Sequence, residues 1–154
     1  MVKVEIVEGY GRLNEVKGLF REYAASLEVD LCFQRFGEEL SSLPGRYAPP
    51  DGRLYLALID GQSAGCIALR RLDEETCEMK RLYVRGDARG LGLGRLLAEQ
   101  IISDARALGY RQIRLDTLPS MRSAQSLYQR LGFTDIPPYC ENPVPGARYM
   151  GLTL

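Results

Sequence analysis

The spacing of hydrophobic residues divides the first third of the chain into a strand and two helices. Apolar and polar residues alternate over residues 2–7, which predicts a strand with one buried face. Large apolar residues then recur every three or four positions over residues 13–27, which predicts an amphipathic helix. A weaker helical pattern covers residues 33–40, and a segment rich in proline and glycine, residues 44–52, follows it. We expect this segment to interrupt the regular structure.

The middle of the chain has the pattern of antiparallel strands. Two apolar runs, residues 54–59 and 64–70, are joined across Asp60 and Gly61, a pair that is typical of hairpin turns. Residues 76–84 alternate again, so the side chains at even positions from 78 to 84 share one face. These segments predict a continuous antiparallel sheet.

The second half alternates helices with strands. A helix is expected to follow a glycine-rich stretch and to end near residue 108, before Gly109. Residues 111–117 predict a strand. Ser120 is placed to cap the next helix, which we expect to end at Gly132.

The last part of the chain predicts two further strands. Phe133 begins a strand that two prolines cut short, and residues 147–154 alternate once more. Together the segments predict one domain over residues 1–154, of the α/β (α+β) class. We expect a mixed, mostly antiparallel sheet of six or seven strands with about four helices.

The composition of the chain excludes several classes of function and site. The 20 basic and 20 acidic residues balance, so no basic field favours nucleic acid or a membrane surface. No apolar run approaches the length of a membrane span, and the first residues lack a signal-peptide core, so we expect a cytoplasmic protein. The absence of histidine excludes histidine-dependent triads and histidine metal sites. The four cysteines are scattered, and we expect reduced thiols and no metal.

Three alternating glycines carry the clearest chemical signal. Gly90, Gly92 and Gly94 lie between a predicted strand and a predicted helix and are flanked by Arg89 and Arg95. The start of a helix offers N–H groups without internal partners and the positive end of the macrodipole, and both favour an anion. Glycine lets the anion approach the main chain because no Cβ is in the way. We therefore predict that this loop binds phosphate.

Other types of glycine-rich loop fit less well. No Lys-Ser or Lys-Thr pair follows the glycines, so the P-loop of kinases and ATPases is excluded. A dinucleotide fingerprint requires a small residue where Leu97 stands, but Asp116 follows at about the expected distance. Dinucleotide binding therefore stays as a weaker alternative. A turn that binds no ligand is a further alternative, although such a turn requires fewer glycines than are present here.

These segments resemble the GNAT superfamily of acetyl-coenzyme A dependent N-acetyltransferases. The coenzyme A loop of that family has the form Q/R-x-x-G-x-G/A, which Arg89, Gly92 and Gly94 match. Residues 80–84 are similar to its fourth strand, and residues 124–133 to its A-x-x-L-Y-x-x-x-G-F helix. The resemblance spans about residues 61–133. It implies a GNAT-type sheet, acetyl-coenzyme A as cosubstrate, no metal, and an amine as acceptor.

The resemblance also assigns residues to the cofactor. In the family, the loop holds the pyrophosphate and the main chain of the preceding strand pairs with the pantetheine arm. The asparagine that is frequent before the helix is replaced by Met121 here, so that contact to coenzyme A is either absent or supplied by Ser120 or Ser123. The implied cofactor-binding residues are Leu82, Tyr83, Val84, Arg89, Gly90, Leu91, Gly92, Leu93, Gly94, Arg95, Ser120, Ser123 and Tyr128.

Two residues take catalytic roles by the same resemblance. Tyr128 matches the tyrosine that often protonates the departing thiolate, and the ordinary pKa values of a phenol, about 10, and a thiol, about 8.5, are close enough for this. Glu78 matches a position from which some members supply a general base, which requires burial to raise its pKa. The alternatives are a core aromatic for Tyr128 and, for Glu78, an exposed carboxylate opposite Arg70 or Arg71.

The acceptor stays open at this stage. A small molecule, an amino acid and a protein amine all agree with the sequence, as does a larger acyl group on coenzyme A. In the family the neighbourhood of residues 33–52 helps to form the acceptor pocket, and a mobile surface connection is the alternative there. A noncatalytic acyl-coenzyme A binding module and a dinucleotide-binding oxidoreductase are the alternative functions, and homodimerisation is also open.

Overall fold

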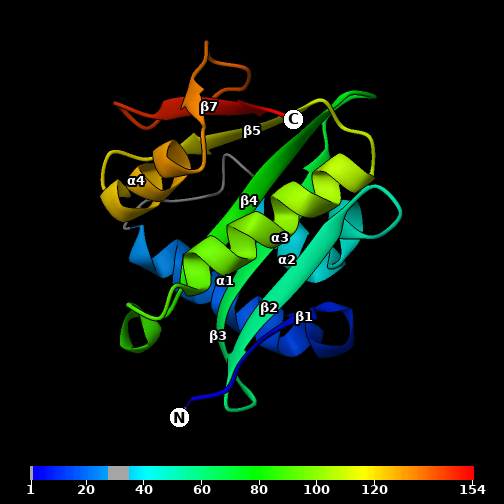
Figure 1. The fold of residues 1–154 in the computed structure, drawn as a ribbon, viewed down its shortest axis with the longest axis vertical. Helices are drawn as coiled ribbons and strands as arrows, with labels where there is room; N and C mark the ends of the chain where they lie inside the picture. Colours follow the sequence, from blue (N-terminus) through cyan, green and yellow to red (C-terminus); the bar gives the residue numbers. More distant parts are fainter. Residues whose placement is uncertain (1, 28–34) are drawn as a thin grey trace.

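A seven-stranded sheet in the order β1-β2-β3-β4-β5-β7-β6 runs through the centre of the protein (Figure 1). The computed structural model describes residues 2–27 and 35–154. β4 and β5 are parallel, and the other neighbouring strands are antiparallel. The strands are β1 (Val4–Glu8), β2 (Arg53–Ile59), β3 (Gln62–Arg71), β4 (Thr76–Val84), β5 (Gln112–Thr117), β6 (Thr134–Asp135) and β7 (Arg148–Thr153).

Helices cover both faces of this sheet. One apolar cluster, with Phe20 and Leu56 fully buried, joins α1 and α2 to β2 and β3. A larger cluster, which includes Leu97 and Ile113, joins α3 and α4 to the opposite face. Within the described residues no helix is long and apolar enough to cross a bilayer. The helices are α1 (Leu13–Ser26), α2 (Phe36–Ser42), α3 (Leu93–Ala107) and α4 (Arg122–Arg130), with short 3-10 turns η1 (Tyr10–Arg12), η3 (Gly45–Tyr47) and η4 (Gly86–Ala88).

The expected fold class is confirmed, and most predicted elements are found within a few residues of their predicted bounds. β2 and β3 form the predicted hairpin across Asp60 and Gly61. The helix predicted at 33–40 corresponds to α2, although residues 33 and 34 lie outside the described part. The prediction that Ser120 caps α4 is wrong, because Met121 occupies the cap position and no side-chain hydrogen bond caps the helix.

The sheet opens at its centre, between β4 and β5. These two strands pair over residues 76–78 and 112–114 only, and beyond this point they run apart (Figure 1). The register of β4 against β3 shifts between Lys80 and Tyr83, and Arg81 in this bulge has a φ of 62°. A bulge increases the local twist and bends its strand, which accounts for the divergence. The opening gives a ligand access to the interior of the sheet.

Candidate active site

The glycine-rich loop has the backbone conformation that the sequence predicted for an anion site. Gly90 and Gly92 have φ values of 90° and 76°, in the left-handed region that favours glycine. Gly92 is the N-cap residue of α3, and no side chain caps this helix end. The first turn of α3 also contains no acidic residue. Its N–H groups and the positive end of its dipole are therefore available to a phosphate.

A groove of about 670 Å³ lies beside this loop. Its volume falls within the range of sites that hold small molecules and cofactors. Leu91 is absent from the lining and is 45% exposed, and Tyr128 lines a neighbouring cavity instead. The other predicted cofactor residues all line the groove: Leu82, Tyr83, Val84, Arg89, Gly90, Gly92, Leu93, Gly94, Arg95, Ser120 and Ser123.

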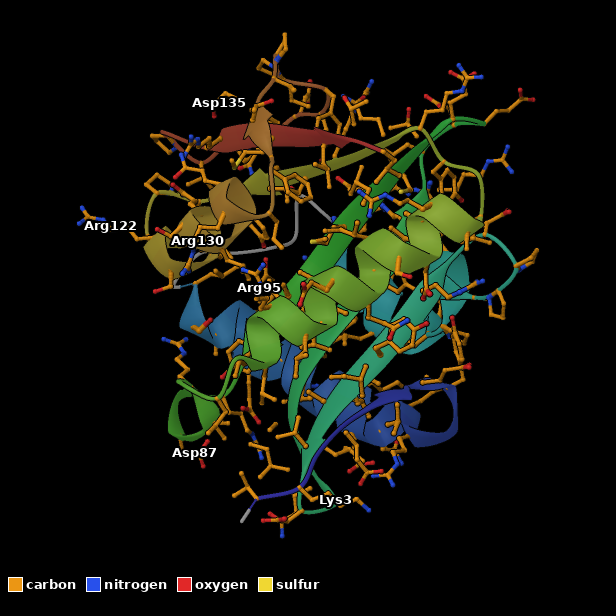
Figure 2. The ribbon with its side chains drawn as sticks, in the orientation of Figure 1. Lys3, Asp87, Arg95, Arg122, Arg130 and Asp135 are labelled. Atoms are coloured by element: carbon orange, nitrogen blue, oxygen red, sulfur yellow. The ribbon has the colours of Figure 1, made fainter. Side chains whose placement is uncertain are left out.

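The groove is positively charged. Four arginines line it, namely Arg89, Arg95, Arg122 and Arg130, and no carboxylate is among its described lining residues. Figure 2 shows Arg95 at the start of α3, and Arg122 and Arg130 on α4, on the same side of the molecule. The ion pair of Arg95 with Glu99, at 3.6 Å, joins two half-exposed side chains and is therefore weak. A cation-rich groove of this kind attracts a multiply charged anion.

The groove continues into a narrow cavity between the diverging strands. The two share lining residues from α1, β4 and the segment before α4, such as Tyr23, Leu82 and Met121. β4 contributes Lys80 and Arg81 to the wall of the narrow cavity, and β5 contributes Asp116 and Thr117. Tyr128 of α4 and Asn142 of the loop before β7 complete that wall. The groove therefore adjoins a polar interior, whose free volume of about 20 Å³ corresponds to about one water molecule.

Tyr128 lies at this junction with its hydroxyl protonated. The residue is only 4% exposed, and its ring packs against Phe133 at 5.7 Å between centroids. Burial raises its pKa above the ordinary value, and Tyr23 and Asp116 act in the same direction. The phenol therefore keeps its proton near neutral pH. This packing agrees with the core position considered as the alternative, and the cavity lining agrees with the catalytic role.

The carboxylate of Glu78 is buried, and both of its oxygens accept a hydrogen bond. Its side chain is 2% exposed, Arg70 donates from Nε at 2.7 Å, and the hydroxyl of Tyr139 donates at 2.6 Å. Burial alone would raise its pKa, but the charges of Lys80 and Arg70 and the hydrogen bonds outweigh burial and lower it. The alternative of an exposed carboxylate is wrong, while the expected contact with Arg70 is confirmed.

Replacing Glu78 with glutamine is expected to make the free energy of unfolding fall less steeply as the pH is lowered. A carboxyl with a lowered pKa in the folded state stabilises the fold above its unfolded pKa, about 4.5, and this contribution is lost as the pH falls further. The wild type should therefore lose stability more steeply than Glu78→Gln between about pH 5 and pH 3. Urea midpoints over this range measure the effect. Glu74→Gln, at an exposed site in the β3–β4 turn, is the control, and equal slopes for Glu78→Gln and wild type would contradict the argument.

The bulge in β4 is held by a buried ion pair that the sequence did not reveal. Arg81 is 3% exposed and donates to both carboxylate oxygens of Glu39, at 2.9 and 3.0 Å. Tyr47 donates its hydroxyl to the same carboxylate at 2.9 Å. The guanidinium also lies over the rings of Tyr23 and Phe36, at 5.7 and 5.3 Å. α2 and η3 therefore fix the strand next to the narrow cavity.

Sequence reasoning also missed the polar residues that surround Glu78. For Lys80, Arg114 and Asp116 the sequence did contain a signal, because these polar residues alternate with apolar residues along β4 and β5. Tyr139 and Asn142 gave none, since they come from the irregular segment before β7. The sequence names Asp116 only as part of a dinucleotide fingerprint, and the structure places it in the wall of the narrow cavity.

Metal and disulfide chemistry find no support in the described residues. No group of three or more His, Cys, Asp or Glu side chains there could hold a metal ion. Cys66, Cys77 and Cys140 are free thiols. Burial is the main reason why the pKa of Cys66 lies above the ordinary value of a thiol. Cys32 lies outside the described residues.

Known acetyltransferases resemble this chain in sequence. The sequence model of the acetyltransferase (GNAT) family matches residues 17–133. An uncharacterized N-acetyltransferase of Schizosaccharomyces pombe is 40% identical over 144 residues, which covers 92% of this chain and 88% of the relative.

Solved structures share the fold across the whole chain. A GNAT-family acetyltransferase of Staphylococcus aureus superposes with a TM-score of 0.81 at 22% identity and covers 98% of this chain and 99% of its own. The PaiA N-acetyltransferase of Thermoplasma acidophilum, solved in complex with coenzyme A, superposes with a TM-score of 0.76 at 18% identity and covers 99% of both chains. With a family match over most of the chain and a relative at 40% identity over nearly all of it, this protein belongs to the acetyltransferase (GNAT) family.

Proposed function

We propose that the protein transfers an acetyl group from acetyl-coenzyme A to an amine by direct attack of the amine on the thioester. One observation carries this proposal most directly. A cationic groove, with no carboxylate among its described lining residues, begins at the glycine loop and adjoins the small cavity that Tyr128 lines. The groove suits the phosphates, and we assign the reacting ends of the two substrates to the place where groove and cavity meet.

The residues of the groove fit coenzyme A. The open space around Gly90 and Gly92, where a Cβ would meet no atom within 4 Å, gives room for a pyrophosphate against the main chain. Leu82, Tyr83 and Val84 have no strand partner on the side of β5 among the described residues, so their peptide groups can bind an extended amide chain. When bound, acetyl-coenzyme A supplies the activated acetyl group.

Protons and bonds balance in a short sequence of events. The acceptor loses one proton to become a neutral amine, and its nitrogen then forms a bond to the acetyl carbon as the carbon–sulfur bond breaks. The sulfur leaves with the electron pair of that bond and takes a proton from the hydroxyl of Tyr128. The nitrogen loses its second proton, Tyr128 is reprotonated, and one proton is released in total. Burial raises the pKa of this phenol, so it stays protonated until negative charge develops on the sulfur.

The base role of Glu78 stays a prediction. Its two hydrogen bonds and lowered pKa make it a weaker proton acceptor than the sequence suggested. They support a positioning role, in which Glu78 holds Arg70 and Tyr139 in place. Among the described residues, Asp116 is a carboxylate that lines the cavity together with Tyr128.

Release of free thiol from acetyl-coenzyme A in the presence of a panel of amines tests the proposed function. A noncatalytic binding module would bind coenzyme A, as seen by a rise in melting temperature, and would release no thiol above the rate without amine. The position of Asp116 argues against the dinucleotide alternative, since it lies in the narrow cavity and does not line the glycine-loop groove. A cytoplasmic location, a homodimer and the size of the acyl group stay predictions.

Gly92→Glu is expected to weaken the binding of coenzyme A by at least roughly tenfold, or about 1.4 kcal/mol. The new side chain strains a residue with a φ of 76° and adds negative charge in the groove. Calorimetry with coenzyme A measures the effect. Gly86→Glu adds the same charge in η4, outside the groove lining, and should bind like the wild type. Unchanged affinity in a folded Gly92→Glu variant would remove this loop from the site.

A further inference from the structure

A second phenol lies where the groove and the narrow cavity meet. Among the described residues, the two hollows share Tyr23, Leu27, Leu82 and Met121 in their linings. Of these four, Tyr23 carries the hydroxyl, and the other three side chains are apolar. Tyr23 comes from α1 and Tyr128 from α4, and both line the narrow cavity. Tyr23 therefore lies at the place to which we assign the thioester end of acetyl-coenzyme A.

The ring of Tyr23 is held by its neighbours in one orientation. It meets the ring of Tyr83 nearly edge to face, at 78° between planes and 6.3 Å between centroids. The guanidinium carbon of Arg81 lies 5.7 Å from the centroid of the Tyr23 ring. Arg81 is in turn fixed by its two hydrogen bonds to Glu39. A side chain that is locked by packing presents its polar group in a set direction before any ligand binds.

The hydroxyl of Tyr23 is suited to donate a hydrogen bond. Burial raises the pKa of Tyr23, and the charge of Arg81 and its hydrogen bond with the phenol oppose this rise without cancelling it. The phenol therefore keeps its proton near neutral pH. Because a guanidinium has only donors, the phenol oxygen is the acceptor in its contact with Arg81, and the hydroxyl proton is left for another acceptor. A hydroxyl whose oxygen accepts such a bond is also a stronger donor.

We propose that Tyr23 donates a hydrogen bond to the carbonyl oxygen of the thioester and stabilises the negative charge that develops there. As the amine nitrogen attacks, the electron pair of the carbon–oxygen π bond moves onto this oxygen, and it returns when the carbon–sulfur bond breaks. Tyr23 keeps its proton throughout, while Tyr128 gives its own proton to the sulfur. This inference rests on the proposed acetyl transfer and adds a second side chain to it.

Tyr23→Phe tests this role through turnover. The change removes one hydroxyl and keeps the ring between Tyr83 and Arg81. At saturating acetyl-coenzyme A, kcat with the best acceptor should fall roughly 10²-fold, the effect of losing one donor to an oxyanion. The affinity for free coenzyme A, which has no acetyl carbonyl, should stay nearly unchanged in calorimetry.

Tyr10→Phe is the matched control. Tyr10 is partly buried, donates its hydroxyl to the main-chain oxygen of Tyr47 at 2.7 Å, and lines neither the groove nor the narrow cavity among their described residues. This variant also loses one phenol hydroxyl and should keep the turnover of the wild type. Melting temperatures of both variants verify that they are folded.

Infrared spectroscopy identifies the atom that Tyr23 contacts. Acetyl-coenzyme A with an isotopic label at the acetyl carbonyl carbon is bound to the wild type, to Tyr23→Phe and to Tyr10→Phe. A donated hydrogen bond weakens the carbonyl bond, so its loss in Tyr23→Phe should move the carbonyl stretch to a higher frequency. Tyr10→Phe should give the frequency of the wild type. This measurement requires neither an acceptor nor turnover.

The outcomes separate this proposal from the proposed function. Lower turnover together with a higher carbonyl frequency in Tyr23→Phe supports the proposal. Lower turnover with an unchanged frequency places Tyr23 against another atom and overturns it, and full turnover overturns it at any frequency. If the wild type released no thiol with any amine, the proposed function would fail, whereas the carbonyl frequency would still test the contact with Tyr23.

Discussion

Tyr128→Phe is expected to lower turnover by roughly 10² to 10⁴, the usual effect of losing a general acid. The change removes one hydroxyl and keeps the ring that packs against Phe133, so melting temperature and coenzyme A affinity should change little. The measurement is thiol release at saturating acetyl-coenzyme A with the best acceptor. A poor acceptor could make attack by the amine the slow step and hide the loss of the acid.

A second buried tyrosine provides the control for this experiment. Tyr110 belongs to the same apolar cluster, is 7% exposed and donates its hydroxyl to the main-chain oxygen of Asp51 at 2.9 Å, outside both cavities. Tyr110→Phe should cost about 1 kcal/mol of stability through the lost hydrogen bond and leave turnover unchanged. If Tyr128→Phe also kept full turnover, solvent would be the proton source.

Glu39→Gln is expected to destabilise the protein by about 3–5 kcal/mol, because it removes a charged partner that binds a buried guanidinium with two hydrogen bonds. The side chain of Arg81 is 1% exposed and that of Glu39 is 15% exposed, so water cannot replace the lost carboxylate. For a chain of this size the loss corresponds to a melting temperature lower by roughly 10 °C. Since Arg81 lies in the β4 bulge beside the narrow cavity, turnover should fall as well.

The neighbouring residue separates this effect from a general effect on α2. Glu38 pairs with Arg35 at 3.9 Å, and both side chains are more than three-quarters exposed. Glu38→Gln should therefore change stability by less than about 1 kcal/mol. Calorimetric melting of both variants gives the comparison. A Glu39→Gln protein as stable as Glu38→Gln would show that the buried pair contributes little to the fold.

The glycine loop was predictable because its signals are local in sequence. Gly90 and Gly92 adopt positive φ and Gly92 caps the start of α3, so a few adjacent residues determine the conformation of the loop. The hairpin at Asp60 and Gly61 is local in the same sense. The helix residues 124–133 combine a short motif with an apolar face, and Tyr128 lies where that face meets the cavity.

The polar contacts around Glu78 and Arg81 were only partly predictable, because most of them join distant segments. The carboxylate of Glu78 is engaged by Arg70, as strand pairing predicted, but also by Tyr139, 61 residues later in the chain. The bulge at Arg81 depends on Glu39, 42 residues earlier. No periodicity records such pairings, and this is why the sequence suggested a raised pKa for Glu78 where the structure lowers it.

The loop between β6 and β7 contributes polar contacts that are separate in sequence from the groove. Tyr139 and Asn142, which contact Glu78 and Asp116, lie after the segment matched by the family, which ends at residue 133. The groove residues that fit coenzyme A all lie before that limit. Substitutions in this loop therefore alter the surroundings of Glu78 and Asp116 and leave the groove unchanged.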